Sequence, residues 1–200
     1  MNEESRVMGT LIVVSGPSGA GKTTIVEKSI AQNGCGARVI TCTTRRPRQE
    51  ETDGKDYRFF SRKDFRKKVS AGAFIEHAKV YGHYYGTLHA DIEAARKNFS
   101  IAFLVTDVQG AATIMYTYPE AHSFFITVAR KELIRRISTR GESPLTLAKR
   151  ITEIDAELAQ AACFDKVIRN RTGRLSASVR EFTAGVTLFR AMDEFVISYA

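Results

Sequence analysis

The sequence contains little cysteine and no spacing typical of a disulfide framework or a metal site. Its three cysteines, Cys35, Cys42 and Cys163, lie far apart and form no CxxC pair. An odd number of isolated cysteines argues against a disulfide scaffold and indicates a reducing compartment. The four histidines also lack the spacing of zinc ligands. We therefore expect neither a disulfide-stapled domain nor a structural zinc site.

Long apolar runs are missing as well. No segment approaches the ~20 consecutive apolar residues that a membrane-spanning helix needs. The polar start, "MNEESRVMGT", has neither the apolar centre nor the cleavage site of a signal peptide. We therefore expect a cytoplasmic protein without a membrane partner. Internal repeats and linkers are absent too, and on the usual scale of ~100–200 residues per domain the 200 residues predict one domain.

The charge of the chain is strongly positive. A formal net charge of +8 favours anionic partners, but nucleotides, nucleic acids and acidic lipids all meet this condition. Within "TTRRPRQE" (residues 43–50) three arginines occur in four positions. This segment could contact nucleic acid without regard to sequence, or it could hold one small phosphate group. Charge alone does not decide between these two possibilities.

Short apolar runs alternate with helical stretches through most of the chain. "TLIVVS" (Thr10–Ser15), "IAFLVTD" and "SFFITV" are typical of strands buried on both faces, and "ARVITC" and "FDKVIRN" predict two more. The alternation predicts an α/β fold whose mainly parallel sheet is flanked by helices. Between about residues 38 and 85 the short strand candidates "DYRFF" and "AFIEHA" flank a basic helix, which predicts a small mixed α+β insert.

A phosphate-binding loop follows the first predicted strand. "GPSGAGKT" fits the pattern G-x-x-x-x-G-K-[ST] and opens a helix, which is the context that the motif requires. Its glycines allow backbone N–H groups to turn inward around an anion. Lys22 can reach the β- and γ-phosphates, and the Thr23 hydroxyl can bind Mg²⁺ that accompanies ATP. The residues expected to bind ATP are Gly16, Pro17, Ser18, Gly19, Ala20, Gly21, Lys22, Thr23 and Thr24.

Three further segments carry a family resemblance. Together with the phosphate loop, "TCTTRRPR", "DGKDY" and "FIEHAKVYGHYYGT" closely resemble guanylate kinases, the P-loop nucleoside monophosphate kinases that transfer a phosphoryl group from ATP to GMP. The resemblance extends from residue 10 to about residue 170. It implies a single domain over residues 1–200, with a core (8–37, 88–135 and 163–200), a GMP-binding insert (38–87) and a helical lid (about 136–162). It also implies a role in purine nucleotide metabolism and direct in-line transfer with lid closure.

The resemblance also assigns roles to individual residues. The side chains expected around the GMP phosphate are Arg45, Arg48, Tyr57 and Tyr85. Those expected around the guanine are Thr41, Glu76, Thr87 and Asp107. Those expected to act in catalysis are Lys22, Arg45, Arg140 and Arg150, the last two from the lid. Asn170 is expected near the adenine of ATP.

The chemistry of these residues suits GMP independently of the family resemblance. A monophosphate carries nearly two negative charges, which guanidinium groups and phenol donors bind well. A carboxylate such as Glu76 accepts hydrogen bonds from N1–H and N2–H₂ of guanine, whereas adenine would present an acceptor to it. A site whose buried polar groups stay unpaired can reject the wrong ligand by as much as ~10⁴-fold. Thr87 could instead cap the following helix, and we expect Arg46 to point into solvent.

Three departures and three alternatives accompany this interpretation. "VTDVQG" has Val105 where the family usually has a first aspartate, and the lid contains Pro144 and is about a residue shorter. "RT" also follows Asn170 in place of the usual acidic pair. The alternatives are a P-loop kinase for another nucleoside monophosphate, a non-catalytic interaction module and, from charge alone, a nucleic-acid binder. We expect ATP and GMP, possibly dGMP, as partners and no nucleic acid, while the oligomeric state is not predicted.

Overall fold

A parallel sheet of five strands forms the centre of the protein. The computed structural model describes residues 8–34, 36–80, 82–139 and 144–198. The strand order is β2-β7-β1-β8-β9, and all four pairings are parallel. The strands are β1 (Thr10–Ser15), β2 (Ala37–Arg38), β7 (Ile101–Val105), β8 (His122–Thr127) and β9 (Lys166–Arg169). The predicted α/β fold with a parallel core is confirmed.

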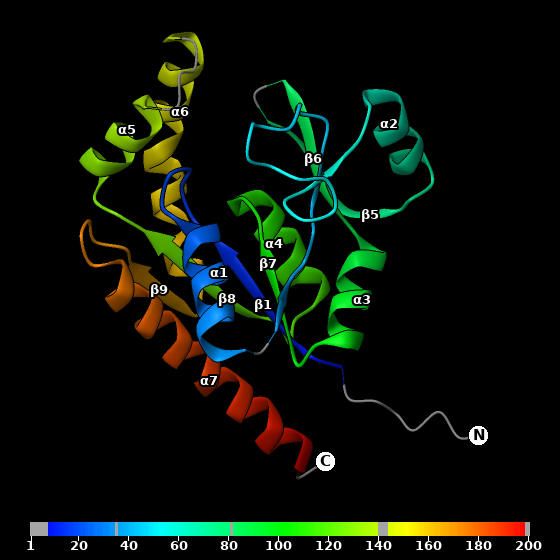
Figure 1. Ribbon diagram of the computed structural model, residues 1–200, viewed down its shortest axis with the longest axis vertical. Helices are drawn as coiled ribbons and strands as arrows, with labels where there is room; N and C mark the ends of the chain where they lie inside the picture. The colour runs from blue at the N-terminus through cyan, green and yellow to red at the C-terminus, as the bar shows by residue number, and fades with distance from the viewer. Residues whose placement is uncertain (1–7, 35, 81, 140–143, 199–200) are drawn as a thin grey trace.

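Helices cover both faces of this sheet (Figure 1). Successive side chains of a strand point to opposite faces, so alternate residues of β1 enter two different cores. Ile12 and Val14 pack on one face with α1 (Lys22–Asn33), α5 (Arg130–Ser138), α6 (Pro144–Ala159) and α7 (Leu175–Ser198). Leu11 and Val13 pack on the other face with α3 (His89–Asn98) and α4 (Val108–Thr117).

A second, smaller sheet lies beside the parallel one (Figure 1). Its order is β4-β3-β6-β5, with β3 and β4 parallel and the other pairs antiparallel, so it is mixed as predicted. Helix α2 (Arg62–Ser70) covers it, and the Phe65 ring of this helix stacks on Phe74 at 4.4 Å and on Tyr84 at 5.4 Å. The strands are β3 (Cys42–Thr43), β4 (Arg58–Phe59), β5 (Phe74–Val80) and β6 (His83–Leu88).

The prediction of one strand for "ARVITC" is wrong, because this run crosses from one sheet to the other. Val39 donates its N–H to the Phe103 carbonyl beside the parallel sheet. Two residues later, the Thr41 carbonyl accepts from Arg58 N–H in the second sheet. The segment therefore leaves the core and enters the insert within a few residues, which apolar patterning alone does not show.

Helix α7 closes the described part of the chain. It has 24 residues, and its buried side chains Val179, Phe182 and Val186 follow the spacing of one helical face. The Phe182 ring lies 4.7 Å from that of Phe124 in β8, which fixes the helix against the sheet. Neither α7 nor any other described helix is long and apolar enough to cross a membrane.

Candidate active site

The loop between β1 and α1 has a shape that only glycine permits at two positions. Gly16 has a φ of 133°, and a Cβ added there would come within 2.0 Å of the Ile126 carbonyl oxygen. Gly21 has a φ of 90°, and its added Cβ would lie 2.5 Å from Nδ2 of Asn170. Both glycines therefore allow the loop to pass close to its neighbours in a conformation that L side chains rarely adopt.

The loop ends at the N-terminus of α1, which offers a site for an anion. No acidic residue occupies the first turn of α1, so the chain does not neutralise the partial positive charge of this helix end. The Lys22 ammonium donates to the carbonyl oxygens of Gly16 and, at 3.2 Å, of Pro17. The side chains of Thr23 and Thr24 are exposed at the same end. This arrangement suits a chain of phosphate groups.

Asn170 supports the loop from the end of β9. Its side chain is buried and donates from Nδ2 to the Ala20 carbonyl at 2.8 Å. Together with Gly21, Thr24 and Arg136 it also lines a cavity of about 220 Å³, which we call the donor cavity. The structure thus brings Asn170 to the phosphate loop, although its contact with adenine stays a prediction.

Helices α5 and α6 add charged side chains to the loop. Arg136 donates to the Gly19 carbonyl at 3.2 Å, and Arg150 donates to Ser18 Oγ at 3.0 Å. Glu157 lies close to Ser18 and Lys22, and burial raises the pKa of its carboxyl although Lys22 opposes this shift. Arg150 and Glu157 are seven residues apart, so both lie on one face of α6. Of the predicted lid arginines, Arg140 lies outside the described residues.

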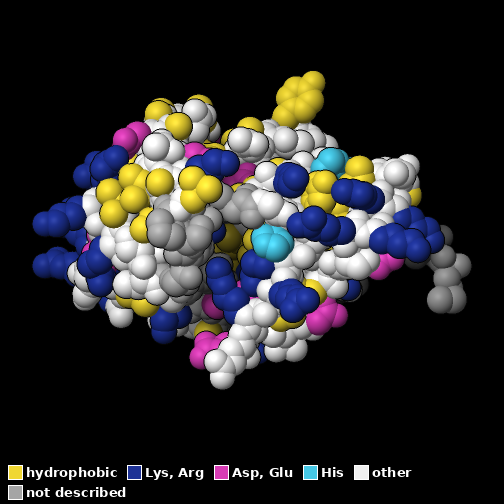
Figure 2. All heavy atoms as spheres, turned by 90° about the horizontal axis from the view of Figure 1, so that it is seen from above, with side chains coloured by type: hydrophobic (Ala, Val, Ile, Leu, Met, Phe, Trp, Pro, Cys, Tyr) yellow, Lys and Arg dark blue, Asp and Glu magenta, His cyan; other side chains and the backbone are white. Residues whose placement is uncertain are grey.

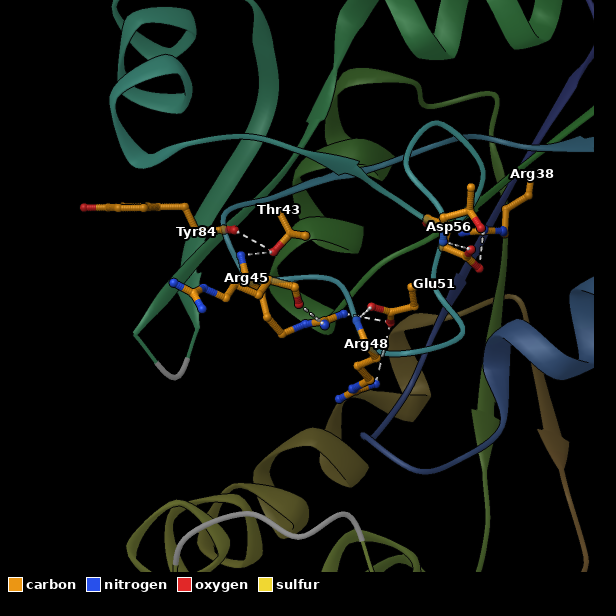
Figure 3. Close-up of polar contacts among 9 residues, drawn as sticks. Arg38, Thr43, Arg45, Arg48, Glu51, Asp56 and Tyr84 are labelled. Atoms are coloured by element: carbon orange, nitrogen blue, oxygen red, sulfur yellow. Dashed lines mark hydrogen bonds and ion pairs between the residues drawn. The ribbon is translucent and has the colours of Figure 1, made fainter.

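Glu51 organises the arginine-rich loop of the insert (Figure 3). Arg45 donates to Glu51 Oε1 at 2.8 Å and to the Arg46 carbonyl at 2.7 Å. The backbone N–H of Arg48 donates to Glu51 Oε2 at 2.8 Å. Burial would raise the pKa of Glu51, but the hydrogen bonds from Arg45 and Arg48 lower it below its ordinary value. Sequence reasoning missed Glu51, whose only signal is an acidic residue within a basic segment.

Two tyrosines and a threonine complete this cluster. The Arg45 guanidinium lies 5.6 Å from the Tyr57 ring centroid, and the Tyr57 and Tyr85 rings meet edge to face at 6.2 Å. Thr43 is fully buried, and its hydroxyl donates to the Tyr84 carbonyl and accepts from Arg45 N–H, each at 3.1 Å. Three of the four predicted phosphate ligands therefore meet. Arg48 lies beside them with a more exposed side chain (57%).

A half-buried carboxylate lies on the neighbouring strand. Thr87 is fully buried, and its hydroxyl donates to Glu76 Oε1 at 2.6 Å across the β5–β6 pair. Burial raises the pKa of Glu76 and the charge of Asp107 adds to this shift, although the Thr87 hydrogen bond opposes it. Leu88, without a side-chain cap bond, is the N-cap of α3, so Thr87 is not the cap of this helix.

Asp107 and Thr41 complete the predicted guanine site. Asp107 caps α4 by accepting from Gly110 N–H at 2.8 Å, so this carboxylate has a structural task as well. A Cβ added to Gly110 would lie 3.2 Å from Glu76 Oε2, which places the insert carboxylate against the first turn of α4. Thr41 is 8% exposed and immediately precedes β3. Seen from above, Lys and Arg side chains border a hollow at the centre of the molecule (Figure 2).

The fold and the site together indicate the class of protein to which this chain belongs. A phosphate loop after the central strand of a parallel sheet, opposite an insert with a cationic cluster and a half-buried carboxylate, is typical of P-loop nucleotide-binding α/β proteins. Residues 8–178 match the protein family described as guanylate kinase. The chain therefore belongs to the guanylate kinase family, as its motifs predict.

Individual relatives agree with this assignment. The chain is 38% identical over 164 residues to a guanylate kinase of Symbiobacterium thermophilum, which covers 81% of this chain and 78% of that protein. It is 40% identical over 166 residues to a guanylate kinase of Vibrio cholerae, covering 81% and 80% of the two chains. The crystal structure of guanylate kinase from Anaplasma phagocytophilum is similar with a TM-score of 0.74 and 27% identity, covering 92% and 87%.

Proposed function

We propose that this protein transfers the γ-phosphoryl group of Mg-ATP to GMP and forms ADP and GDP. The observation that carries the proposal is the Glu76–Thr87 pair on β5 and β6, near the cluster of Tyr85 on β6 with Arg45 and Tyr57 in the loops beside β3 and β4. The pair offers a carboxylate to the N–H groups of a base, and the cluster offers a guanidinium and phenols to a phosphate. The names of the family and of its relatives agree with this activity.

Guanine is the base that this carboxylate suits. An ionised carboxylate has about four lone-pair positions, so the hydrogen bond from Thr87 leaves acceptor capacity for N1–H and N2–H₂. Adenine presents an unprotonated N1 in the corresponding position, which would leave the half-buried charge of Glu76 without a donor from the base. Asp107 lies close enough to raise the pKa of Glu76 and could accept from the same edge. Thr41 could donate to O6.

The arginine loop is suited to the monophosphate of GMP. Arg45 and Arg48 would bind its oxygens, with the hydroxyls of Tyr57 and Tyr85 as further donors. Each guanidinium has five N–H donors, so Arg45 can keep its bond to Glu51 while it binds phosphate. The carboxylate of Glu51 would hold the loop in this orientation before GMP arrives, which lowers the ordering cost of binding.

The phosphate loop would hold the donor. Lys22 lies against the Gly16 and Pro17 carbonyls and would turn toward the β- and γ-phosphates. The exposed Thr23 hydroxyl at the start of α1 fits Mg²⁺, which takes most of its ligands from water and phosphate oxygens. Among the described residues, no group of three or more His, Cys, Asp or Glu side chains forms a protein-only metal site. The ion, when bound, neutralises phosphate charge.

Transfer would be direct and in line, with closure over both nucleotides. Positioning and charge neutralisation supply most of the catalysis in phosphoryl transfer. Arg150 already contacts Ser18 in the phosphate loop, and with Arg140, Lys22 and Arg45 it would surround the transferring group. The corresponding division of the chain is a core (8–37, 88–135 and 163–200), a GMP-binding insert (38–87) and a lid (about 136–162). Closure would also exclude water, which otherwise competes with GMP.

ADP release in the presence and absence of GMP tests this proposal. With Mg-ATP alone we expect only slow hydrolysis, and addition of GMP is expected to raise ADP release at least ~10²-fold because the acceptor site is then filled. Calorimetric titration with GMP, in the same buffer, measures binding separately. GMP that binds without stimulating ADP release would instead support the interaction module.

A further inference from the structure

A second cavity lies along the open edge of the parallel sheet. It has a volume of about 670 Å³, and we call it the β9 cavity. Its walls come from β9, the 3₁₀ turn η1 (Gln160–Cys163) and the first turns of α7. This volume lies within the ~300–1,000 Å³ that is typical of small-molecule sites. The side chains that matter below are Val167, Arg169, Arg171, Arg174 and Glu181.

The three arginines of this cavity differ from many of the other described arginines. Several of those pair closely with carboxylates, as in Arg58–Asp91 (2.7 Å), Arg96–Glu120 (2.8 Å) and Arg130–Asp155 (2.7 Å). Within the described residues, no ion pair joins a cavity arginine to a carboxylate. Glu181 is the acidic residue of the lining, so three positive charges and one negative charge give a net charge of +2.

The backbone around the cavity does not favour an added peptide strand. β9 has four residues and only one paired neighbour, β8. The Arg169 carbonyl accepts from Arg171 N–H at 3.0 Å and from Ser178 Oγ at 3.4 Å, so it is not available to a further strand. An extended acidic peptide would therefore find few main-chain partners at this edge.

Phosphate groups match the cavity better. Planar guanidinium groups bind phosphate oxygens through two parallel hydrogen bonds, and three of them can follow a chain of linked phosphates. Val167 is 39% exposed in the same lining, and Ala161 and Ala162 add an apolar wall that a nucleoside could cover. Arg171 lines both this cavity and the donor cavity.

We propose that the β9 cavity binds a small molecule with two or more linked phosphate groups, and that its occupancy changes donor-nucleotide affinity through Arg171. The ligand chemistry is a polyphosphate chain, carried either by a nucleoside triphosphate or by inorganic polyphosphate. Binding here is independent of the proposed activity, whereas the coupling rests on the proposed function because it needs ATP in the donor cavity.

Calorimetric titration with inorganic tripolyphosphate tests the site. The phosphate loop is first saturated with a non-hydrolysable Mg-ATP analogue, and the acceptor site with GMP. We expect one further equivalent to bind. The double variant R169Q/R174Q should weaken this event at least ~10-fold, since it removes two charged hydrogen-bond donors. The matched variant R180Q changes an exposed α7 arginine outside both cavities and should alter the affinity less than ~2-fold.

The outcomes separate the possibilities. No binding beyond the filled substrate sites, or equal losses in R180Q and the double variant, would overturn the site. Repeating the titration with GTP distinguishes the sources: tighter binding than tripolyphosphate identifies a nucleotide, and equal binding identifies the phosphate chain as the recognised part. Either result supports the site.

The coupling between the β9 cavity and donor-nucleotide affinity is measured in a separate experiment. The affinity for the ATP analogue is measured with and without tripolyphosphate in the wild type and in R169Q/R174Q. Tripolyphosphate can compete with the ATP analogue at the phosphate loop in both proteins. A difference between the wild type and the double variant in the shift of analogue affinity therefore comes from the β9 cavity. Identical shifts in the two proteins would refute the coupling. Without tripolyphosphate, ADP release by the double variant should stay within ~2-fold of the wild type, because neither arginine lies in the proposed substrate sites.

Discussion

Glu76→Gln removes the charge of the acceptor-site carboxylate while it keeps the size of the side chain. In the unliganded protein this side chain is half-buried, and the pKa of its carboxyl is raised above the ordinary value of 4.5, first by desolvation and then by Asp107. A raised folded-state pKa means that the protonated form is favoured in the folded protein. Stability therefore falls as pH rises through that pKa, and ionised Glu76 destabilises the protein at neutral pH. The variant is expected to melt at the same or a higher temperature.

Whereas the substitution should preserve or raise the stability of the protein, it should weaken the use of GMP. The carboxylate would accept from two guanine N–H groups, and hydrogen bonds to a charged group contribute about 1.5–3 kcal/mol each. Glutamine keeps one acceptor oxygen but turns an NH₂ donor toward guanine donors. A net loss of about 3–4 kcal/mol corresponds to a decrease of ~10²–10³-fold in kcat/KM for GMP, since each 1.4 kcal/mol is a factor of ten. ATP binds elsewhere, so its affinity should change less than ~2-fold.

Three measurements separate these effects. ADP release at varied GMP measures kcat/KM, titration calorimetry with an ATP analogue measures donor affinity, and a thermal scan measures Tm. Glu50→Gln, which changes an exposed carboxylate of the arginine loop, is the matched control and should behave like the wild type. The affinity of the wild type for GMP should also fall as pH is lowered through the raised pKa of Glu76, and the variant should lack this component. Equal losses for GMP and ATP, or a lower Tm in the variant, would refute the reasoning.

Four further substitutions test the rest of the site. Lys22→Ala should lower kcat at least ~10²-fold with little change in the calorimetric Kd for GMP, and a comparable loss of GMP affinity would contradict its role at the donor phosphates. Arg48→Ala should raise the KM for GMP ~10-fold or more, and Arg46→Ala should raise it less than ~2-fold. If both arginines belonged to a general basic patch, the two substitutions would raise the KM by similar factors. Glu51→Gln should raise the KM for GMP ~5–20-fold by loosening the arginine loop, with unchanged ATP affinity as the check. Gly110→Ala would bring a methyl group to 2.4 Å from Thr106 Oγ1 and 3.2 Å from Glu76, so GMP use should fall while Mg-ATP binding persists.

The phosphate loop could be predicted from sequence because its geometry is set locally. Gly16 and Gly21 need a positive φ that the adjoining strand and helix determine, and β1 occupies the predicted residues Thr10–Ser15. Glu76 could be placed in the site only through its surrounding motif. Its pairing with Thr87 depends on the β5–β6 register, which contains an irregularity between Phe74 and Glu76.

Contacts between distant elements could not be predicted. Glu157 reaches Ser18 only because α6 packs over the phosphate loop, and no local pattern indicates this. The sequence does not predict helix α4, because Gly110 in its first turn weakens the helical signal, and it gives no indication that Asp107, expected near the guanine, also caps this helix. In the second sheet, β3 has two residues and is too short for a periodic pattern, whereas the strand candidate "DYRFF" does contain β4.

The transfer of label from ATP to a mixture of acceptors tests the central claim most directly. The protein is incubated with γ-labelled Mg-ATP and equal concentrations of GMP, AMP, CMP and UMP, and the labelled products are separated by chromatography. The account predicts that at least ~99% of the transferred label appears in GDP, because among these four bases only guanine presents two adjacent N–H donors, N1–H and N2–H₂, to Glu76. Label that appears mainly in another nucleoside diphosphate, or only in inorganic phosphate, would contradict it.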